Sequence, residues 1–459
     1  AAASRGLPGI RALALLGHET LLVYVLHLTL LFGGVFGPSP LTRRRFSHAT
    51  PIRGIQRVRL VSRHRCVPAF REIEEKTSPI RLPWYWAAPR PALPEAPRPE
   101  FLSLEKLEER ACTLALELGP ERIERRRGGS HLARLSEHAT RLRVAYRAAA
   151  ADVHGGEPLP AAAEWLLDNF HMVEAEVRNV RHDLPKGYHR RLPRVTPSDA
   201  DDRTRIEMLA DDLLAHSDGR LEVARVTRYL SAFQAVAPLS IGELWAWPSV
   251  LKLALLARLR ESTDGLIAAR ESRLSALVFL RAIDVGKETD VLPALPATFD
   301  VPFVVQLVQR LREYGSAVAP IRTALEERLA RDGLTIEEAI RDETRRQATE
   351  QISVANVFTS LRFCGSEDWR ELFERTSLVE RVLQRDPAGV YARMDFLSRD
   401  RYRHVVESLA GPRGEDQLEV ALRCVDEARR AADQDGPDAR RAHVGDHLIG
   451  NARPALQAD

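Results

Sequence analysis

Residues 159–182 read LPAAAEWLLDNFHMVEAEVRNVRH, and the spacing of their apolar side chains indicates the fold class. Five of these side chains follow one another at intervals of four, three, four and three residues: Leu166, Phe170, Val173, Val177 and Val180. This spacing predicts one apolar stripe along an α-helix, and such a stripe packs into a core. Asn169 and Glu176 lie at the edge of the stripe, where half-buried polar groups need partners. Glu174 and Arg178, four residues apart, are expected to form a surface ion pair.

The helical period continues along almost the whole chain after Phe101. It predicts helices over 103–118, 130–152, 159–182, 203–217, 221–235, 240–262, 264–284, 300–314, 317–331, 335–362, 367–384, 397–410 and 415–433. Ser240 with Glu243, and Thr335 with Glu338, have the spacing of capping boxes. Because there is no repeat of fixed length, we predict a mainly α fold, an irregular multi-helix bundle, divided into helical domains at 101–335 and 336–459.

The first 40 residues form a separate segment in this interpretation. Residues 21–37, LLVYVLHLTLLFGGVFG, contain no Asp, Glu, Lys or Arg and are just long enough to cross a bilayer. Arg43–Arg45 follows directly, which by the positive-inside rule places the rest of the chain in the cytoplasm. We therefore expect residues 1–40 to be an apolar membrane-type helix. This stretch resembles the last transmembrane helix of a multi-pass acyltransferase.

Residues 41–100 are expected to be a disordered linker. They are rich in proline and hold thirteen Lys and Arg against five acidic residues. Contact of this stretch with anionic lipid or nucleic acid is the alternative. The remainder of the chain is mildly acidic, which argues against a nucleic-acid-binding domain.

The overall composition excludes several classes of protein. The 459 residues carry 67 Lys and Arg against 64 Asp and Glu, a net charge of +3, and 29% of them are charged. That charged fraction excludes a protein that is apolar membrane helix throughout. The four Cys, at positions 66, 112, 364 and 424, have neither zinc-site nor disulfide-framework spacing, so a reducing compartment is expected.

No catalytic, cofactor-binding or metal-binding residue is predicted. Asp199 and Asp201 have the spacing that sugar transferases use to hold a divalent ion, but they precede a helix rather than end a strand. Asp168, His171 and Glu174 do not converge on one face of their helix. The usual nucleotide-binding, nucleophile-elbow and zinc-protease motifs are missing.

Five residues are candidates for a partner interface. Trp245 and Trp247 in GELWAWPSV can stack on a sugar or anchor a partner, and core packing is the alternative. Arg399, Arg401 and Arg403 can meet an acidic partner such as a diphosphate. An internal salt network with Asp395 and Asp400 is the alternative for these arginines.

Several strings together resemble the N-terminal region of bacterial cyclic β-1,2-glucan synthases. They are EWLLDNFHMVEAEVRNVRHDLPKGYHRRLP (164–193), LSIGELWAWPSVLKLALLARLRE (239–261), FVVQLVQRLREY (303–314), the stretch from QISVANVF to VVESLA (351–410) and RRAHVGDHLI (440–449). Their order and spacing hold across about residues 100–450. This covers some three quarters of the chain.

The resemblance implies a parent protein that polymerises glucose from UDP-glucose at the inner membrane, with a divalent metal in its transferase domain and a self-glucosylated tyrosine as primer. Those parts would lie beyond Asp459. The chain itself would be a cytoplasmic, non-catalytic helical region, with residues 41–459 in the cytoplasm. Its partners would be the transferase and transmembrane domains of the same parent, which it would support or regulate. The alternative is a membrane-tethered helical adaptor with no connection to sugar chemistry.

Overall fold

The computed structural model describes residues 100–118, 123–124, 131–195, 203–289, 292–413 and 416–454. These residues fall within one compact unit, Pro89–Asp459, and the domain boundary expected at 335/336 lies inside that unit. The predicted membrane-type helix at 1–40 and all but the last residue of the 41–100 linker lie outside the described residues. No helix among the described residues has the length and apolar composition needed to cross a bilayer.

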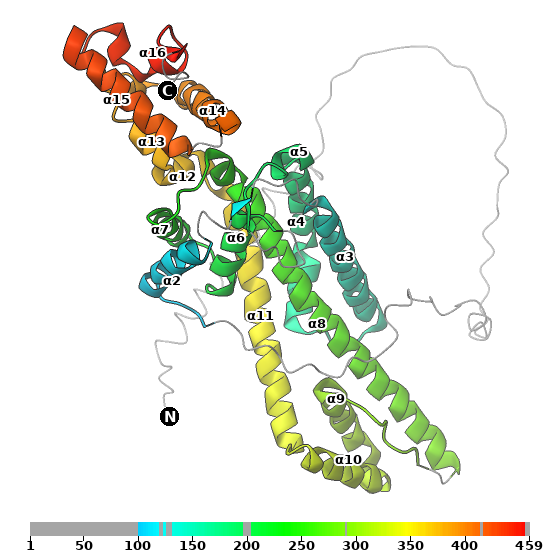
Figure 1. The fold of residues 1–459 in the computed structure, drawn as a ribbon. Helices are drawn as coiled ribbons and strands as arrows, with labels where there is room; N and C mark the ends of the chain where they lie inside the picture. The colour runs from blue at the N-terminus through cyan, green and yellow to red at the C-terminus, as the bar shows by residue number, and fades with distance from the viewer. Residues whose placement is uncertain are drawn as a thin grey trace, which may run out of the picture. The chain divides into compact units, whose positions relative to one another are not determined.

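The fold is mainly α, as predicted (Figure 1). The α-helices are α2 (Leu104–Glu117), α3 (His131–Gly155), α4 (Ala161–Asp183), α5 (Lys186–His189), α6 (Arg205–Ala215), α7 (Val223–Gln234), α8 (Ile241–Thr289), α9 (Val301–Leu311), α10 (Ala319–Arg331), α11 (Ile336–Ser366), α12 (Trp369–Thr376), α13 (Leu378–Leu383), α14 (Phe396–Arg413), α15 (Gln417–Asp435) and α16 (Val444–Leu448). In the described part of the chain, these helices are joined by the 3₁₀ segments η3 (Arg312–Val318), η4 (Tyr391–Arg393) and η5 (Arg440–Ala442). A short antiparallel pair, β1 (Ile123–Glu124) with β2 (Arg194–Val195), was not expected from the sequence.

Helix α8 is the axis around which the others pack. It contacts α3, α4, α6, α9, α11 and α12. The prediction of two helices, at 240–262 and 264–284, was wrong because α8 runs unbroken through position 263. Thr263 is buried and its hydroxyl donates to the carbonyl oxygen of Arg260 at 2.9 Å. Gly265, two residues further on, lies against Glu350 of α11.

Helix α4 buries the stripe that its sequence predicts. All five apolar residues of the stripe are buried, and α4 packs against α3, α8 and α11. The two edge residues have found partners on other helices. The Oδ1 atom of Asn169 accepts from Arg362 at 2.6 Å, and Glu176 pairs with Lys252 at 2.8 Å. Glu174 was expected to pair with Arg178 on its own helix. Instead, its carboxylate lies 3.8 Å from Arg143 on α3.

One end of the unit is a hairpin with its own core. The C-terminal part of α8, the whole of α9 and α10, and the start of α11 enclose one apolar cluster that includes Phe279, Leu307 and Leu325. Thr335 and Glu338 form the predicted capping box at the start of α11. The turn before it contains Gly333 with a φ of 72°, a conformation that glycine adopts without strain. Helices α8 and α11 thus leave and re-enter the bundle through this hairpin (Figure 1).

The C-terminal helices form the other end of the unit. The single helix predicted at 367–384 is two helices, α12 and α13, because Ser377 interrupts it and caps α13 by accepting from the N–H of Glu380 at 3.2 Å. Helix α15 contacts α13, α14 and α16, while α12 contacts α7 and α8. Helix α12 therefore joins the C-terminal helices to the axis of the bundle.

Candidate functional site

Both candidate tryptophans pack against other parts of the protein, Trp247 buried and Trp245 half-buried. Trp247 is fully buried, so it cannot present a stacking surface to a sugar. The ring of Trp245 stacks on Phe373 of α12 with centroids 4.7 Å apart and meets the edge of Phe396 at 5.9 Å. Aromatic contacts of this geometry stabilise a helix interface beyond the area that they bury. The interface that Trp245 anchors is therefore internal, between α8 and the C-terminal helices.

Arg403 is also internal, contrary to its candidacy for a partner surface. Its side chain is 0% exposed and donates to Glu380, which is 0% exposed as well, at 2.7 Å. A second contact joins Arg403 to Asp400 at 3.2 Å. The guanidinium lies over the rings of Phe396 and Phe373, with distances of 4.7 and 5.1 Å to the centroids. A buried guanidinium needs such partners because desolvating an unpaired charge costs several kcal/mol.

Of the other two candidate arginines, Arg399 is largely buried and Arg401 is exposed. Arg399 is 15% exposed and bridges Glu374 at 2.8 Å and Glu380 at 3.0 Å. Arg401 is exposed. Asp395 accepts hydrogen bonds from the N–H and the hydroxyl of Ser398 and caps α14. Asp400, in contrast, belongs to the arginine network through its contact with Arg403. Of the five candidates, only Arg401 lies on the open surface.

Glu380 is the centre of this charge cluster. Besides the two arginines, it accepts from the hydroxyl of Tyr391 at 2.7 Å. Burial and the nearby Glu380 carboxylate raise the pKa of Tyr391, so its phenol stays protonated and donates. We define the charge cluster as Glu374, Glu380, Tyr391, Arg399, Asp400 and Arg403. The sequence alone suggested its arginines but not Glu374 or Glu380, because those lie on α12 and α13 and reach α14 only in three dimensions.

A second buried carboxylate ties the chain's last helix to the loop after α13. Asp386 accepts from the N–H groups of Tyr391 at 3.0 Å and Val444 at 3.0 Å, and lies 2.8 Å from Nδ1 of His443. Burial opposes ionisation, but these hydrogen bonds outweigh it and lower the pKa of Asp386. Nε2 of His443 lies 3.2 Å from the hydroxyl of Tyr402. Through these hydrogen bonds, Asp386 joins the loop after α13 to the start of α16, 58 residues later in the sequence.

Among the described residues, no group of three or more His, Cys, Asp or Glu side chains is placed to hold a metal ion. Asp199 and Asp201 lie outside the described residues.

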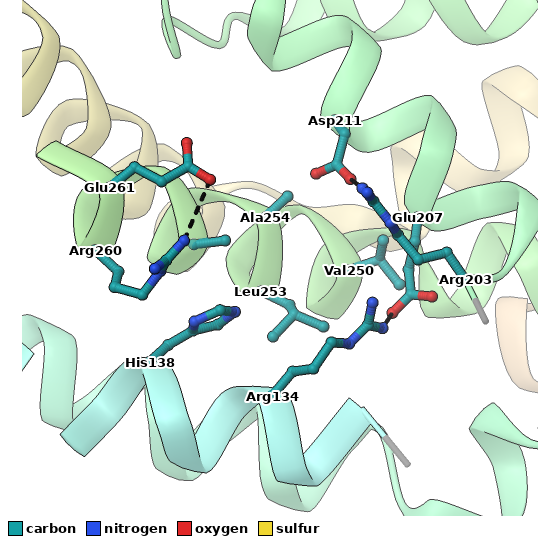
Figure 2. A pocket seen from close by; sticks show the side chains of 11 residues that line it. Arg134, His138, Arg203, Glu207, Asp211, Val250, Leu253, Ala254, Arg260 and Glu261 are labelled. Carbon is teal, nitrogen blue, oxygen red and sulfur yellow. Dashed lines mark hydrogen bonds and ion pairs between the residues drawn. The ribbon is translucent and has the colours of Figure 1, made fainter. Parts of the chain in front are cut away.

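A polar pocket lies between α3, α8 and the start of α6 (Figure 2). Its volume is about 180 Å³. The apolar wall is formed by side chains of α8 that include Val250, Leu253 and Ala254. The polar wall consists of Arg134, His138, Arg203, Glu207, Asp211, Arg260 and Glu261. The sequence does not predict this pocket, because its residues come from three segments that are distant in sequence. Thr204 and Glu207, a capping box at the start of α6, were the only local signal.

Charge pairs line one end of the pocket. Arg203 pairs with Asp211 at 2.5 Å, and Arg134 forms a short ion pair with Glu207. Although burial opposes ionisation, the hydrogen bond from His189 and the positive charge of Arg134 lower the pKa of Glu207 to about 2. Glu207 is therefore a carboxylate at neutral pH and fixes the position of Arg134.

Taken together, these features define the class of protein region: a non-repetitive helical bundle whose buried charges join helices to one another, with a polar pocket large enough for a small ligand. Over 334 residues the chain is 34% identical to a cyclic beta-(1,2)-glucan synthase, NdvB of Rhizobium meliloti (strain 1021). The match covers 71% of this chain and 12% of that relative. The predicted resemblance is confirmed: the chain contains a region that resembles this synthase. No protein-family model matches the chain.

Proposed function

We propose that this helical region supports or regulates cyclic β-1,2-glucan synthesis and does not itself transfer glucose. The observation that carries the proposal is the 34% identity to a cyclic beta-(1,2)-glucan synthase over 71% of the chain. The chain spans about an eighth of that relative's length, so most of the relative consists of other regions. The proposed role is to present a rigid helical surface to those regions.

The internal charge pairing supports a structural role. The charge cluster and the Asp386 group join α12, α13, α14 and α16, and Trp245 connects them to α8. Such pairs stabilise one arrangement of helices, because breaking a buried pair leaves an uncompensated charge. A rigid bundle with an exposed arginine, Arg401, on α14 suits contact with an acidic surface. The partners in this proposal are the transferase and membrane parts of a synthase, and the location is the cytoplasmic face of the inner membrane.

The proposal is tested by incubating the chain with radiolabelled UDP-glucose and either Mg²⁺ or Mn²⁺. We expect no release of UDP and no labelled glucan from the chain alone. Saturable turnover of UDP-glucose that is lost on heat denaturation would contradict the non-catalytic role. A membrane-tethered adaptor, unrelated to sugars, would instead leave glucan synthesis by a synthase unchanged.

A further inference from the structure

We propose that the C-terminal end of α4, together with α5 and the two residues after it, binds the anionic headgroups of a phospholipid membrane. Helix α5 lies at the end of α4, so these segments share one end of the bundle (Figure 1). Their basic residues are all exposed, and we call them the basic corner: Arg178, Arg181, Lys186, Arg190 and Arg191. Such a surface has a role only where the chain lies at a membrane, so the inference rests on the proposed function.

Helix α5 is fixed on the bundle through two residues that lie between its basic ones. The hydroxyl of Tyr188 donates to the carbonyl oxygen of Gly242 on α8 at 2.6 Å. Nε2 of His189 lies 3.2 Å from the carboxylate of Glu207 on α6. With these two side chains turned inward, the lysine before them and the two arginines after them face solvent. The two arginines of α4 likewise lie outside the face that α4 buries.

The positive charge of the basic corner is not neutralised by the rest of the described residues. Among them, no carboxylate forms an ion pair with any of its five members. Arg181 donates to the hydroxyl of Ser136 at 3.3 Å, and this contact leaves its charge in place. Asp183 is the only acidic residue between positions 178 and 191, and its carboxylate lies 2.8 Å from Nδ1 of His182. Salt screens charges beyond about 10 Å, so this local excess determines what the corner attracts.

The composition of the basic corner favours lipid headgroups over a protein partner. Protein interfaces have an apolar centre, but the aliphatic residues of this stretch, Val180 and Leu184, are buried. Clusters of about four to eight Lys and Arg are typical of segments that bind anionic lipid through charge alone. Nucleic acid also presents phosphates, but the mildly acidic balance of the chain after residue 100 disfavours a nucleic-acid-binding domain. The partner that fits is an anionic membrane surface.

The test is co-sedimentation of the full chain with vesicles of phosphatidylcholine alone, and with vesicles of phosphatidylcholine and phosphatidylglycerol in equal amounts. The combined variant Lys186→Gln, Arg190→Gln and Arg191→Gln removes three charges of the basic corner. We expect it to weaken binding to the anionic vesicles by about tenfold or more, because each basic residue near an anionic surface adds to the attraction. Binding to the neutral vesicles should not change. Arg191→Gln alone should weaken binding by about fivefold and serves as the test if the combined variant does not fold.

The matched control is the combined variant Arg312→Gln, Arg331→Gln and Arg341→Gln, which removes the same charge from exposed positions in η3, α10 and α11. It should bind anionic vesicles as the wild type does. Equal weakening in the two combined variants would overturn the proposal, because net charge would then account for the binding. Vesicle binding that is unchanged in the basic-corner variant while binding to double-stranded DNA falls would overturn it as well. Because the assay contains no synthase and no UDP-glucose, its outcome is separate from that of any glucan-synthesis experiment.

Discussion

The guanidinium of Arg403 and the carboxylate of Glu380 form an ion pair at 2.7 Å, and neither side chain is exposed to solvent. This pair joins α14 to α13 at the centre of the charge cluster. A surface ion pair of the same length contributes at most about 1 kcal/mol to the free energy of unfolding. Removing one member of a buried pair lowers that free energy by about 3–5 kcal/mol. The pair therefore gives the most direct mutational test of the C-terminal packing.

We expect Arg403→Met to lower the free energy of unfolding by about 3 kcal/mol, because it leaves the Glu380 carboxylate with fewer partners. The measurement is urea denaturation followed by circular dichroism. Arg401→Met, two residues away on the same helix but exposed, is the matched control and should change stability by less than about 0.5 kcal/mol. Equal losses for the two variants would show that the cluster does not hold the helices together.

Two glycines that both lie against α11 should respond in opposite directions to alanine. Gly265 lies inside α8, where a Cβ would meet Glu350 at 3.4 Å, an ordinary contact. Gly265→Ala should stabilise by about 0.5–1 kcal/mol, since alanine is the better helix former. Gly219 has a φ of 69°, and a Cβ there would lie 3.3 Å from Val357. Gly219→Ala should therefore destabilise by about 1 kcal/mol or more.

The same denaturation experiment checks both glycine variants. Destabilisation by Gly265→Ala would contradict the close but unstrained packing of α8 on α11. A neutral Gly219→Ala would contradict the left-handed turn at Gly219.

Stability should fall when the pH is lowered from 7 to 5, and buried histidine is one cause. The pKa of His131 is about 4 in the folded state, against about 6.5 when exposed. Between these values the unfolded state binds more protons, so acid favours unfolding. For His131 the loss at pH 5 is about 2 kcal/mol. Glu207, with a pKa of about 2, keeps its charge at pH 5, so the stability that its charge contributes is lost only at lower pH.

Replacing His131 by Phe tests this assignment. We expect the difference in unfolding free energy between pH 7 and pH 5 to shrink by about 2 kcal/mol in the variant. His171→Phe, at an exposed position on α4, is the control and should leave the pH dependence unchanged. An unaltered difference in the His131 variant would show that another group titrates in this range.

The helical periodicity predicted most elements because it reports which side each helix buries. The stripe on α4 and the capping boxes at Ser240 and Thr335 are local signals, and the structure confirms all of them. The break predicted at position 263 is absent, because α8 continues through it and packs against α11 along this stretch. Ser377, followed by Glu380, has the spacing of a helix start, but it lies within a longer periodic stretch that predicts one continuous helix.

The residues of the charge cluster and of the pocket were harder to predict, because their partners lie on other helices. Arginines near Asp400 were recognised as a salt network or an interface, but their main partner, Glu380, lies about twenty residues away on another helix. The pocket combines α3, α6 and α8, which no single window of sequence brings together. Packing between distant segments determines which charged side chains pair, and the periodicity of one helix carries no information about that packing.

Arg401→Ala should weaken assembly with the transferase part of a synthase and leave the helical signal unchanged, because Arg401 is exposed on α14. Co-purification of the chain with that part measures the assembly. Arg429→Ala, at another exposed position on α15, is the control. Equal recovery of both variants would remove Arg401 from the proposed interface.

The most direct test of the proposed role uses membranes that contain the Rhizobium relative without the region matching this chain. Glucan synthesis from UDP-glucose is measured in these membranes before and after the purified chain is added. We expect synthesis to be low in the absence of the chain and to rise several-fold when it is added, with no product from the chain alone. Synthesis that is unaffected both by the deletion and by the added chain would contradict a supporting or regulatory role.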